Sequence, residues 1–184
     1  MKRLSFLLLI TLVVFSCKKN ESKTDTLTTV DSSDSPIVNT QTPSLKEYTV
    51  AQLEEKLQSK NDTLYVTNFF ATWCGPCIRE LPHFTAHMKE LEGKKVKFTF
   101  VSLDEKEEWE TKVPEFVKEH GIAGHSYLID GYALSPEFYS KEFKTWDGSS
   151  IPFTFFRQGE KTEEIIGMMT KERMQSVFDS FQID

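Results

Sequence analysis

The residues best suited to chemistry are two cysteines, Cys74 and Cys77, which are separated by two residues and directly follow a mostly apolar run. Thiolate is the reactive form of cysteine, and a helix N-terminus favours it because unpaired backbone N–H groups and the helix dipole stabilise negative charge. A helix that begins here places Cys74 at its N-terminus and Cys77 one turn further in. Cys77 can then attack a mixed disulfide held on Cys74 and release the reduced partner. The spacing therefore predicts thiol-disulfide exchange.

Hydrophobic periodicity predicts the elements that position this pair. The run Leu64 to Phe70 is typical of a strand buried on both faces, and the helix after it has Pro76 in its first turn and a kink at Pro82. Further strands are expected over residues 96–103, 127–129, 153–157 and 163–166, and further helices over residues 50–59, from Trp109 to Val117, and over residues 136–144 and 171–181. Strands that alternate with helices and end in an antiparallel pair predict an α/β fold with a central mixed sheet flanked by helices.

Length and composition limit the classes of function. The chain has 184 residues, enough for one ordinary domain with extra segments. Its formal charge of -6 leaves no excess of positive charge to neutralise a phosphate backbone, so nucleic acid is not an expected partner. Fifteen Phe residues supply an apolar core, so the fold does not need cysteines for stability.

The N-terminus has the layout of an export signal. Lys2 and Arg3 precede an apolar run from Leu4 to Phe15. This run is too short for a transmembrane helix, which needs about 20 apolar residues. We therefore predict a signal peptide over residues 1–16.

The third cysteine, Cys17, leaves an odd count and needs a separate explanation. It ends a segment, Val14-Phe15-Ser16-Cys17, that resembles the lipobox of bacterial lipoproteins, although Phe15 stands where small residues are more usual. A lipidated Cys17 resolves the odd count; the alternative is cleavage by an ordinary signal peptidase at a different bond. Residues 17–44 then form a lipidated, flexible tether with a reach of roughly 30 Å, because they hold few large apolar side chains. The folded domain is expected over residues 45–184.

The segment Trp73-Cys74-Gly75-Pro76-Cys77 resembles the active site of thioredoxins. Pro82 follows the second cysteine at the position where that family kinks its helix. The pair Ile151-Pro152 resembles the cis-proline of the family and the start of the strand after it. The resemblance implies that Pro152 holds the chain beside Cys74 and that the Ile151 backbone pairs with an extended substrate. Trp73, although part of the motif, is expected mainly to shield the active-site face.

Within the thioredoxin superfamily the chain is most similar to the extracytoplasmic TlpA/ResA-like branch. The similarity lies in the export signal, in the run from Asn68 to Cys74, and in Glu80-Leu81-Pro82. The long segment before Pro152 implies an inserted helix and strand. Asn68 departs from cytosolic thioredoxins, which carry a buried Asp there as proton acceptor for the second cysteine. Glu80 is the carboxylate left nearby, so we hypothesise that it tunes the thiols or shuttles their proton; the alternative is a solvated acid on the helix.

The resemblance also implies partners and a place in the cell. Gly75-Pro76 is the dipeptide of thioredoxins that act as reductants, although potentials in the superfamily range from about -270 to about -120 mV. The expected protein faces the periplasm of a bacterial envelope, is lipid-anchored to a membrane, and works without a cofactor. A membrane thiol transporter donates electrons to it, and disulfide-bearing exported proteins such as an apocytochrome c accept them.

A zinc site is one alternative, with Cys74, Cys77, His83 and His87 as ligands. An apolar stripe through Ile78, Leu81, Thr85 and Met88 leaves the histidines on other faces of the helix, and the spacing from Cys77 to His83 is far below that of zinc fingers. No metal is therefore expected.

Two further alternatives concern the cysteines themselves. A peroxidase with one attacking cysteine needs a hydroxyl residue three positions earlier, where Ala71 stands. A structural disulfide in a non-catalytic binding or chaperone module is the other, although so short a loop adds little stability. Insulin reduction discriminates between this module and an enzyme.

Overall fold

A computed structural model describes residues 44–184 of the chain, so the predicted signal peptide, Cys17 and nearly all of the tether lie outside the described residues. The sheet has six strands in the order β1-β4-β3-β2-β5-β6. They are β1 Lys46–Glu47, β2 Leu64–Phe70, β3 Val96–Ser102, β4 Ser126–Leu128, β5 Phe153–Gln158 and β6 Lys161–Ile166. The pairs β1–β4, β4–β3 and β3–β2 are parallel, and the pairs β2–β5 and β5–β6 are antiparallel. This confirms the predicted mixed sheet.

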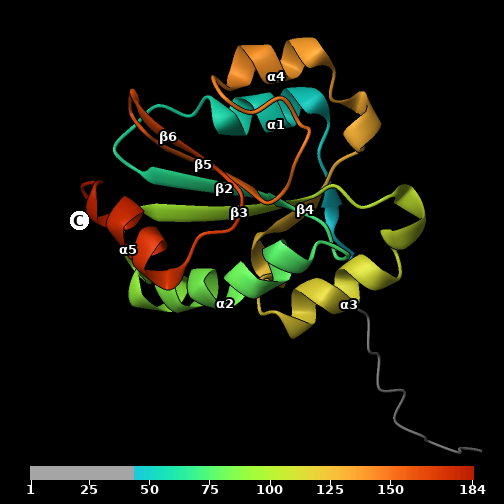
Figure 1. Cartoon of the computed structure of the whole chain (residues 1–184), viewed down its shortest axis with the longest axis horizontal. Coiled ribbons are helices and arrows are strands. Elements are labelled where there is room, and N and C mark those ends of the chain that lie inside the picture. Colours follow the sequence, from blue (N-terminus) through green and yellow to red (C-terminus); the bar gives the residue numbers. More distant parts are fainter. Residues whose placement is uncertain (1–43) are drawn as a thin grey trace, which may run out of the picture. The chain divides into compact units, whose positions relative to one another are not determined.

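Helices cover both faces of this sheet (Figure 1). They are α1 Val50–Leu57, α2 Gly75–Glu90, α3 Lys112–Glu119, α4 Pro136–Glu142 and α5 Lys171–Asp179, with short 3-10 turns at Lys106–Glu108, Ala123–His125 and Gly131–Ala133. Helices α1 and α4 pack on one face, and α2, α3 and α5 on the other. Each face buries its own apolar cluster, and both cysteines belong to the cluster under α2. The segment before β5 contains α3, β4 and α4, so the helix and strand predicted there are present.

Local sequence explains how the central elements begin. Thr49 caps α1 through a reciprocal capping box with Gln52. Cys74 is the N-cap of α2, Pro76 lies in its first turn, and Pro82 lies inside the helix, as predicted. Strand β2 is buried almost throughout because β3 and β5 flank it and helices cover both faces.

The structure differs from the sequence prediction in three places. Strand β1 was not predicted, because two residues carry no detectable period. Helix α3 begins only at Lys112, after Trp109, so that Pro114 lies in its first turn, where no helical hydrogen bond is lost. The predicted apolar stripe of α2 is wrong by one residue: the buried face holds Cys77, Glu80, Leu81, Phe84 and His87. Two polar side chains lie on this face, which hides it from a hydrophobic pattern.

No helix within residues 44–184 is both long and apolar enough to cross a membrane.

Candidate active site

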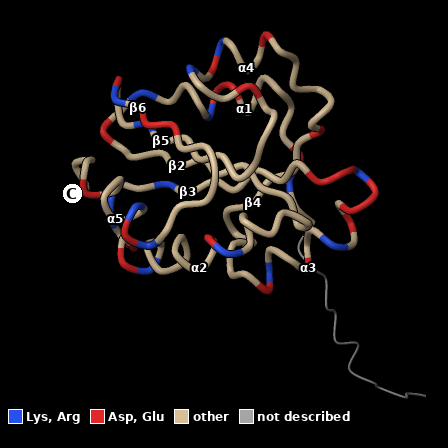
Figure 2. Tube along the Cα trace, viewed as in Figure 1, with Lys and Arg blue, Asp and Glu red and all other residues tan. Residues whose placement is uncertain are grey.

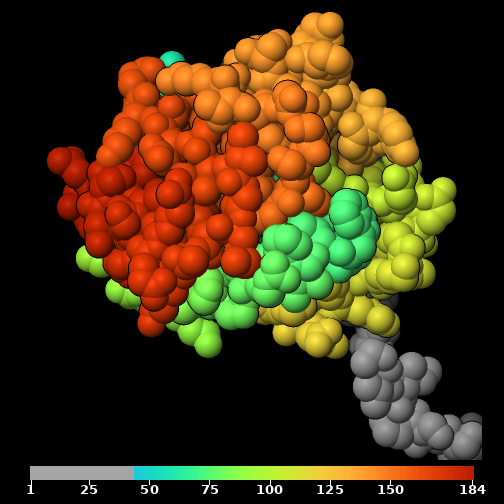
Figure 3. Space-filling view, in the orientation of Figure 1, coloured from blue at the N-terminus to red at the C-terminus, as the bar shows by residue number. Residues whose placement is uncertain are grey.

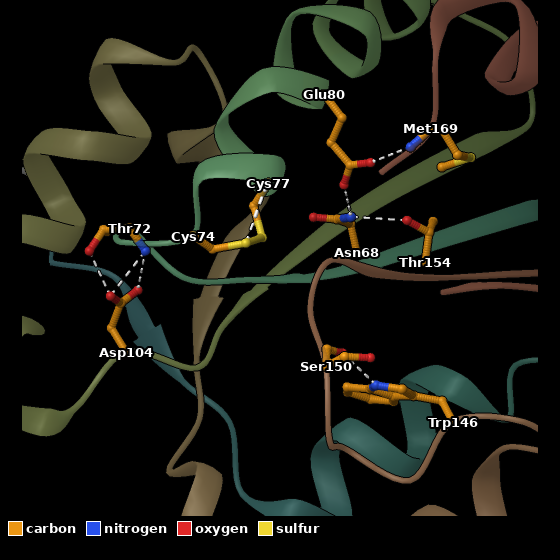
Figure 4. The surroundings of a disulfide bond; sticks show 10 residues. All are labelled: Asn68, Thr72, Cys74, Cys77, Glu80, Asp104, Trp146, Ser150, Thr154 and Met169. Atoms are coloured by element: carbon orange, nitrogen blue, oxygen red, sulfur yellow. Dashed lines mark hydrogen bonds between the residues drawn. A yellow bond between two sulfur atoms is a disulfide. The ribbon is translucent and has the colours of Figure 1, made fainter. Parts of the chain in front are cut away.

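The two cysteines form a disulfide at the N-terminus of α2, directly after the carboxyl end of β2 (Figure 4). Sγ of Cys74 accepts a hydrogen bond from the backbone N–H of Cys77 at 3.3 Å, as expected of an N-cap. Cys77 is fully buried, whereas Cys74 keeps 4% exposure. Trp73 beside them is 71% exposed. The arrangement places Cys74 on the outer side of the disulfide and Cys77 on the inner side.

The start of α2 reaches the surface between the C-terminal segments and the segment around α3 (Figure 3). A groove of about 410 Å³ is lined by Trp73 and by Phe116. Its other lining residues include four glutamates, Glu105, Glu108, Glu115 and Glu119. Figure 2 shows that acidic residues dominate the loop after β3, on this side of the molecule. The exposed side of the disulfide is therefore apolar near Trp73 and acidic beyond it.

The bond between Ile151 and Pro152 is cis, as the resemblance implied. Ile151 packs against the apolar cluster that contains both cysteines. The carbonyl of Pro152 accepts a hydrogen bond from the N–H of Gly167 at 2.8 Å. Ile151 packs against the second apolar cluster as well, so the cis-proline loop contacts both clusters, one of which contains the cysteines.

Trp146 fixes the loop that leads into Pro152. Its Nε1 donates to the carbonyl of Ser150 at 2.8 Å (Figure 4). Its ring stacks on Phe153 with centroids 4.2 Å apart. The carboxylate of Glu164 accepts hydrogen bonds at 2.8 Å from the backbone N–H groups of the two residues before Trp146. These contacts hold both ends of the loop between Lys144 and Phe153. The segment before Pro152 therefore fixes the position of the cis-proline.

On the other side of the disulfide, Asp104 holds the turn that precedes Trp73. Its carboxylate accepts hydrogen bonds from the N–H of Thr72 at 3.0 Å, from the Thr72 hydroxyl at 2.6 Å and from the Ser102 hydroxyl at 2.8 Å. Asp104 is buried. The turn is therefore anchored to the end of β3 (Figure 4).

A second buried carboxyl, Glu80, lies one turn after Cys77 on α2 and is completely inaccessible to solvent. Its Oε1 accepts from Nδ2 of Asn68 at 2.9 Å, and its Oε2 accepts from the N–H of Met169 at 3.0 Å. Nδ2 of Asn68 also donates to the hydroxyl of Thr154 at 2.9 Å (Figure 4). The interpretation of Glu80 as a solvated acid on the helix is therefore wrong.

Burial raises the pKa of Glu80 to about 7, although the hydrogen bonds from Met169 and Asn68 act in the opposite direction. A carboxyl with a pKa near neutrality can both accept and release a proton under physiological conditions. Glu80 thus has the burial and the pKa that a proton acceptor near the thiols requires.

The residues of the zinc alternative do not converge on a common point. Cys74 and Cys77 bond to each other, and His87 is buried against Phe178, with ring centroids 4.5 Å apart. Burial lowers the pKa of His87. Within residues 44–184 no three His, Cys, Asp or Glu side chains form a group that could hold a metal ion.

Sequence reasoning missed the residues that support the site: Thr72, Asp104, Trp146, Thr154 and Met169. The register of β2 with β5 places Thr154 directly opposite Asn68, so a correct strand pairing is the signal that finds it. Asp104 follows β3 as Thr72 follows β2, and the carboxyl ends of adjacent parallel strands meet at one edge of a sheet. No sequence pattern of this kind predicts the hydrogen bond from the N–H of Met169 to Glu80.

Known proteins resemble this chain in sequence and in fold. The chain is 27% identical over 110 residues to the thiol-disulfide oxidoreductase ResA of Bacillus cereus, an alignment that covers 59% of this chain and 57% of that protein. It is 27% identical over 111 residues to the sporulation thiol-disulfide oxidoreductase A of Bacillus subtilis, covering 59% of this chain and 62% of that protein. The chain thus spans less than two thirds of the length of either curated relative.

Among solved structures, a DsbF homologue from Corynebacterium diphtheriae superimposes with a TM-score of 0.54 at 19% identity, over 68% of this chain and 80% of that one. This match confirms the thioredoxin fold, an α/β fold with a central mixed sheet, which the resemblance to thioredoxins implies. The relatives confirm the predicted resemblance to ResA. The model of the AhpC/TSA family matches residues 30–161, which is more than half of the chain, so this chain belongs to the AhpC/TSA family.

Proposed function

We propose that this chain is a thiol-disulfide oxidoreductase that exchanges its Cys74–Cys77 pair with disulfides of exported proteins. The observation that carries the proposal is the disulfide itself, with Cys74 as the N-cap of α2 and Cys77 buried behind it. An N-cap sulfur accepts a backbone N–H bond and lies at the positive end of the helix dipole, and both effects favour its thiolate.

In the reductive direction, the thiolate of Cys74 attacks one sulfur of the partner's disulfide, and the other partner sulfur leaves as a thiolate. Cys77 then loses its proton and attacks Sγ of Cys74, which releases the second partner sulfur and forms the intramolecular disulfide. The partner gains two electrons, and the Cys74–Cys77 pair loses them. Glu80 accepts the proton of Cys77, since it is buried one turn away on the same helix and its pKa lies near 7.

The neighbouring residues have supporting roles. Gly75 and Pro76 form the first turn of α2 between the cysteines, and Pro76 needs no hydrogen-bond partner for its nitrogen there. The backbone of Ile151, held by the cis bond to Pro152, pairs with an extended substrate segment. Trp73 covers the substrate beside Cys74, because it is the most exposed large apolar side chain next to the disulfide.

Reduction of the partner is the proposed direction, because Gly75-Pro76 is the dipeptide of thioredoxins that act as reductants. A membrane thiol transporter supplies the electrons, and the acceptors are disulfide-bearing exported proteins such as an apocytochrome c. ResA and the sporulation oxidoreductase support the reaction class by their names, and the direction rests on the dipeptide.

The proposed organisation is a signal peptide over residues 1–16, a lipidated Cys17 with a tether to residue 44, and a thioredoxin-like domain over residues 45–184 that faces the periplasm. We expect fatty-acid labelling of the full chain in cells to be lost in Cys17→Ala and retained in Cys74→Ser. Equal labelling of both variants contradicts the anchor.

Insulin reduction tests the activity. Wild-type protein with dithiothreitol as electron donor should accelerate insulin precipitation, Cys74→Ser should not exceed the uncatalysed rate, and Cys17→Ala should match wild type. A non-catalytic binding module with a structural disulfide predicts instead that wild type and Cys74→Ser are equally inactive. Trapping of mixed disulfides on a Cys77→Ser variant in intact cells then identifies the partners, because that variant retains the attacking sulfur and lacks the resolving one.

A further inference from the structure

The side-chain amide of Asn68 forms hydrogen bonds through its NH₂ group but not through its oxygen. Both of its N–H groups are engaged, one with Oε1 of Glu80 and one with the hydroxyl of Thr154, each at 2.9 Å. Its Oδ1 is buried and has no hydrogen-bond partner within the described part of the chain. An unpartnered buried oxygen costs free energy, so this amide needs an explanation beyond stability.

The partner that this amide faces changes its own hydrogen-bonding character. Ionised Glu80 only accepts hydrogen bonds, whereas protonated Glu80 also donates one. The groups around its carboxyl are Asn68 from β2, with Thr154 of β5 behind it, and the N–H of Met169 that precedes α5. None of these groups carries a charge, and the titratable neighbour on α2 is Cys77, one turn earlier. The protonation of Glu80 therefore has to be accommodated by neutral partners.

We propose that the amide of Asn68 is a two-state partner for Glu80, rotating by about 180° so that it donates to the ionised carboxylate and accepts from the protonated acid. Thr154 anchors it in both states, because a hydroxyl can accept from Nδ2 or donate to Oδ1. Asn68 and Thr154 are thus positioning residues.

The contacts of Asn68 with Glu80 and Thr154 are paired in both states. In the ionised state Nδ2 donates to Oε1 of Glu80 and to Oγ1 of Thr154, as the structure shows. In the protonated state Oε1 carries the proton and donates it to Oδ1 of Asn68, which uses its second lone pair for the hydroxyl of Thr154. Oε2 of Glu80 keeps its bond from the N–H of Met169 throughout. A leucine at position 68 can serve neither state, and an ionised aspartate can only accept.

This inference rests on the proposed role of Glu80 in the exchange reaction. The proton that Cys77 loses when it attacks Sγ of Cys74 passes to Oε1 of Glu80, and the rotated amide holds the resulting acid until the proton leaves. Without rotation, the O–H of the protonated acid faces an N–H donor of Asn68 instead of an acceptor, and the transfer is opposed.

The test uses the full chain in its disulfide form, in which neither Cys74 nor Cys77 titrates. Carbon-13 shifts of the Glu80 carboxyl report its protonation, and nuclear Overhauser contacts from the Asn68 NH₂ protons to the side chain of Thr154 report the amide orientation. We expect these contacts above the pKa of Glu80 and their loss below it, with one shared midpoint. Contacts that persist while Glu80 becomes protonated overturn the proposal, and so does a carboxyl that stays ionised down to about pH 4.5, near its unperturbed pKa.

Glu80→Gln is the matched control, because its amide resembles the protonated acid. The N–H of Met169 requires the oxygen of the new side chain, so its NH₂ group faces Asn68, which must present Oδ1. We expect the Asn68 signals of this variant to be independent of pH and to match the low-pH signals of wild type. Signals that match the high-pH form contradict the rotation.

Asn68→Leu gives a second measurement on the same carboxyl. A fixed amide that only donates stabilises the ionised form alone, so its loss should raise the pKa of Glu80 by about one unit or more. A two-state partner stabilises both forms, so its loss should shift the pKa by less than about half a unit. Because these measurements involve no turnover, a failure of the rotation is distinguishable from a failure of the exchange reaction, which the insulin assay reports separately.

Discussion

Two buried carboxyls flank the disulfide, and they are held in different ways. Asp104 accepts hydrogen bonds from a backbone N–H and from two hydroxyls, those of Thr72 and Ser102. Glu80 accepts one hydrogen bond on each oxygen, from Asn68 and from Met169. Asp104 is saturated with donors and anchors backbone, whereas Glu80 is sparsely bonded and poised between two protonation states.

The difference follows from the elements that carry the two residues. Asp104 lies just beyond β3, where loop N–H groups and hydroxyls from two strand ends gather. Glu80 lies in the interior of α2, whose own N–H groups are used within the helix, so only groups from the sheet and from the segment before α5 can reach it. Position in the fold thus decides that one carboxylate anchors the turn before Trp73 and the other keeps few hydrogen-bond partners, as the proposed proton transfer requires.

Removal of the anchoring carboxyl should have the largest effect. Asp104→Ala leaves the Thr72 N–H and two hydroxyls without an acceptor, and each such loss costs about 1–3 kcal/mol when buried. We expect the free energy of unfolding of the oxidised protein to fall by about 3–5 kcal/mol, as measured by urea titration. A loss below about 1 kcal/mol contradicts the anchoring role.

Removal of the titrating carboxyl should change the stability in a way that depends on pH. The pKa of Glu80 is raised in the folded state from 4.5 to about 7, so between these values the folded protein binds more protons than the unfolded chain. Wild type therefore loses stability as pH rises through this window, and Glu80→Gln does not. Relative to wild type, the variant should be more stable at about pH 8 than at about pH 5 by roughly 2–3 kcal/mol. A difference that is the same at both pH values means that Glu80 does not titrate in this window.

Much of the fold could be predicted from the sequence because its strongest signals are local. The apolar run Leu64–Phe70 is strand β2 as predicted, and Cys74 caps α2 as its spacing required. The cis bond at Pro152 was implied by resemblance, since an X-Pro bond alone favours trans.

The burial of Glu80 could not be read from the sequence. Two stripes one residue apart both satisfy the helical period on α2, and the buried one contains polar Glu80 and His87. Only the tertiary partners decide between them: the N–H of Met169 and the amide of Asn68 supply the hydrogen bonds that make a buried carboxyl tolerable. Glu80 was thus identifiable as a candidate proton acceptor by its chemistry, whereas its burial could not be predicted from the hydrophobic pattern.

The smallest predicted effect comes from removing one hydroxyl group next to each of the two buried carboxyls. Thr154 and Ser102 are both buried hydroxyl residues, the first bonded to Asn68 and the second to Asp104. Thr154→Val and Ser102→Ala should each lower the free energy of unfolding by about 1 kcal/mol, the net worth of one hydrogen bond. Because the rotating amide of Asn68 uses the Thr154 hydroxyl in both states of Glu80, the Thr154→Val loss should be equal at about pH 5 and about pH 8.

Urea titrations of the oxidised variants measure both losses, with Ser102→Ala as the control for a hydroxyl whose carboxyl partner is an anchor. A fixed amide gives a different pattern for Thr154→Val. At low pH the protonated Glu80 disrupts a donor-only Asn68, so the hydroxyl of Thr154 already has a weakened partner, and its removal costs less than at high pH. Suppose that Thr154→Val lowers the free energy of unfolding only at high pH, while Ser102→Ala lowers it equally at both pH values. This result would support Glu80 as the titrating group and reject the rotation of Asn68.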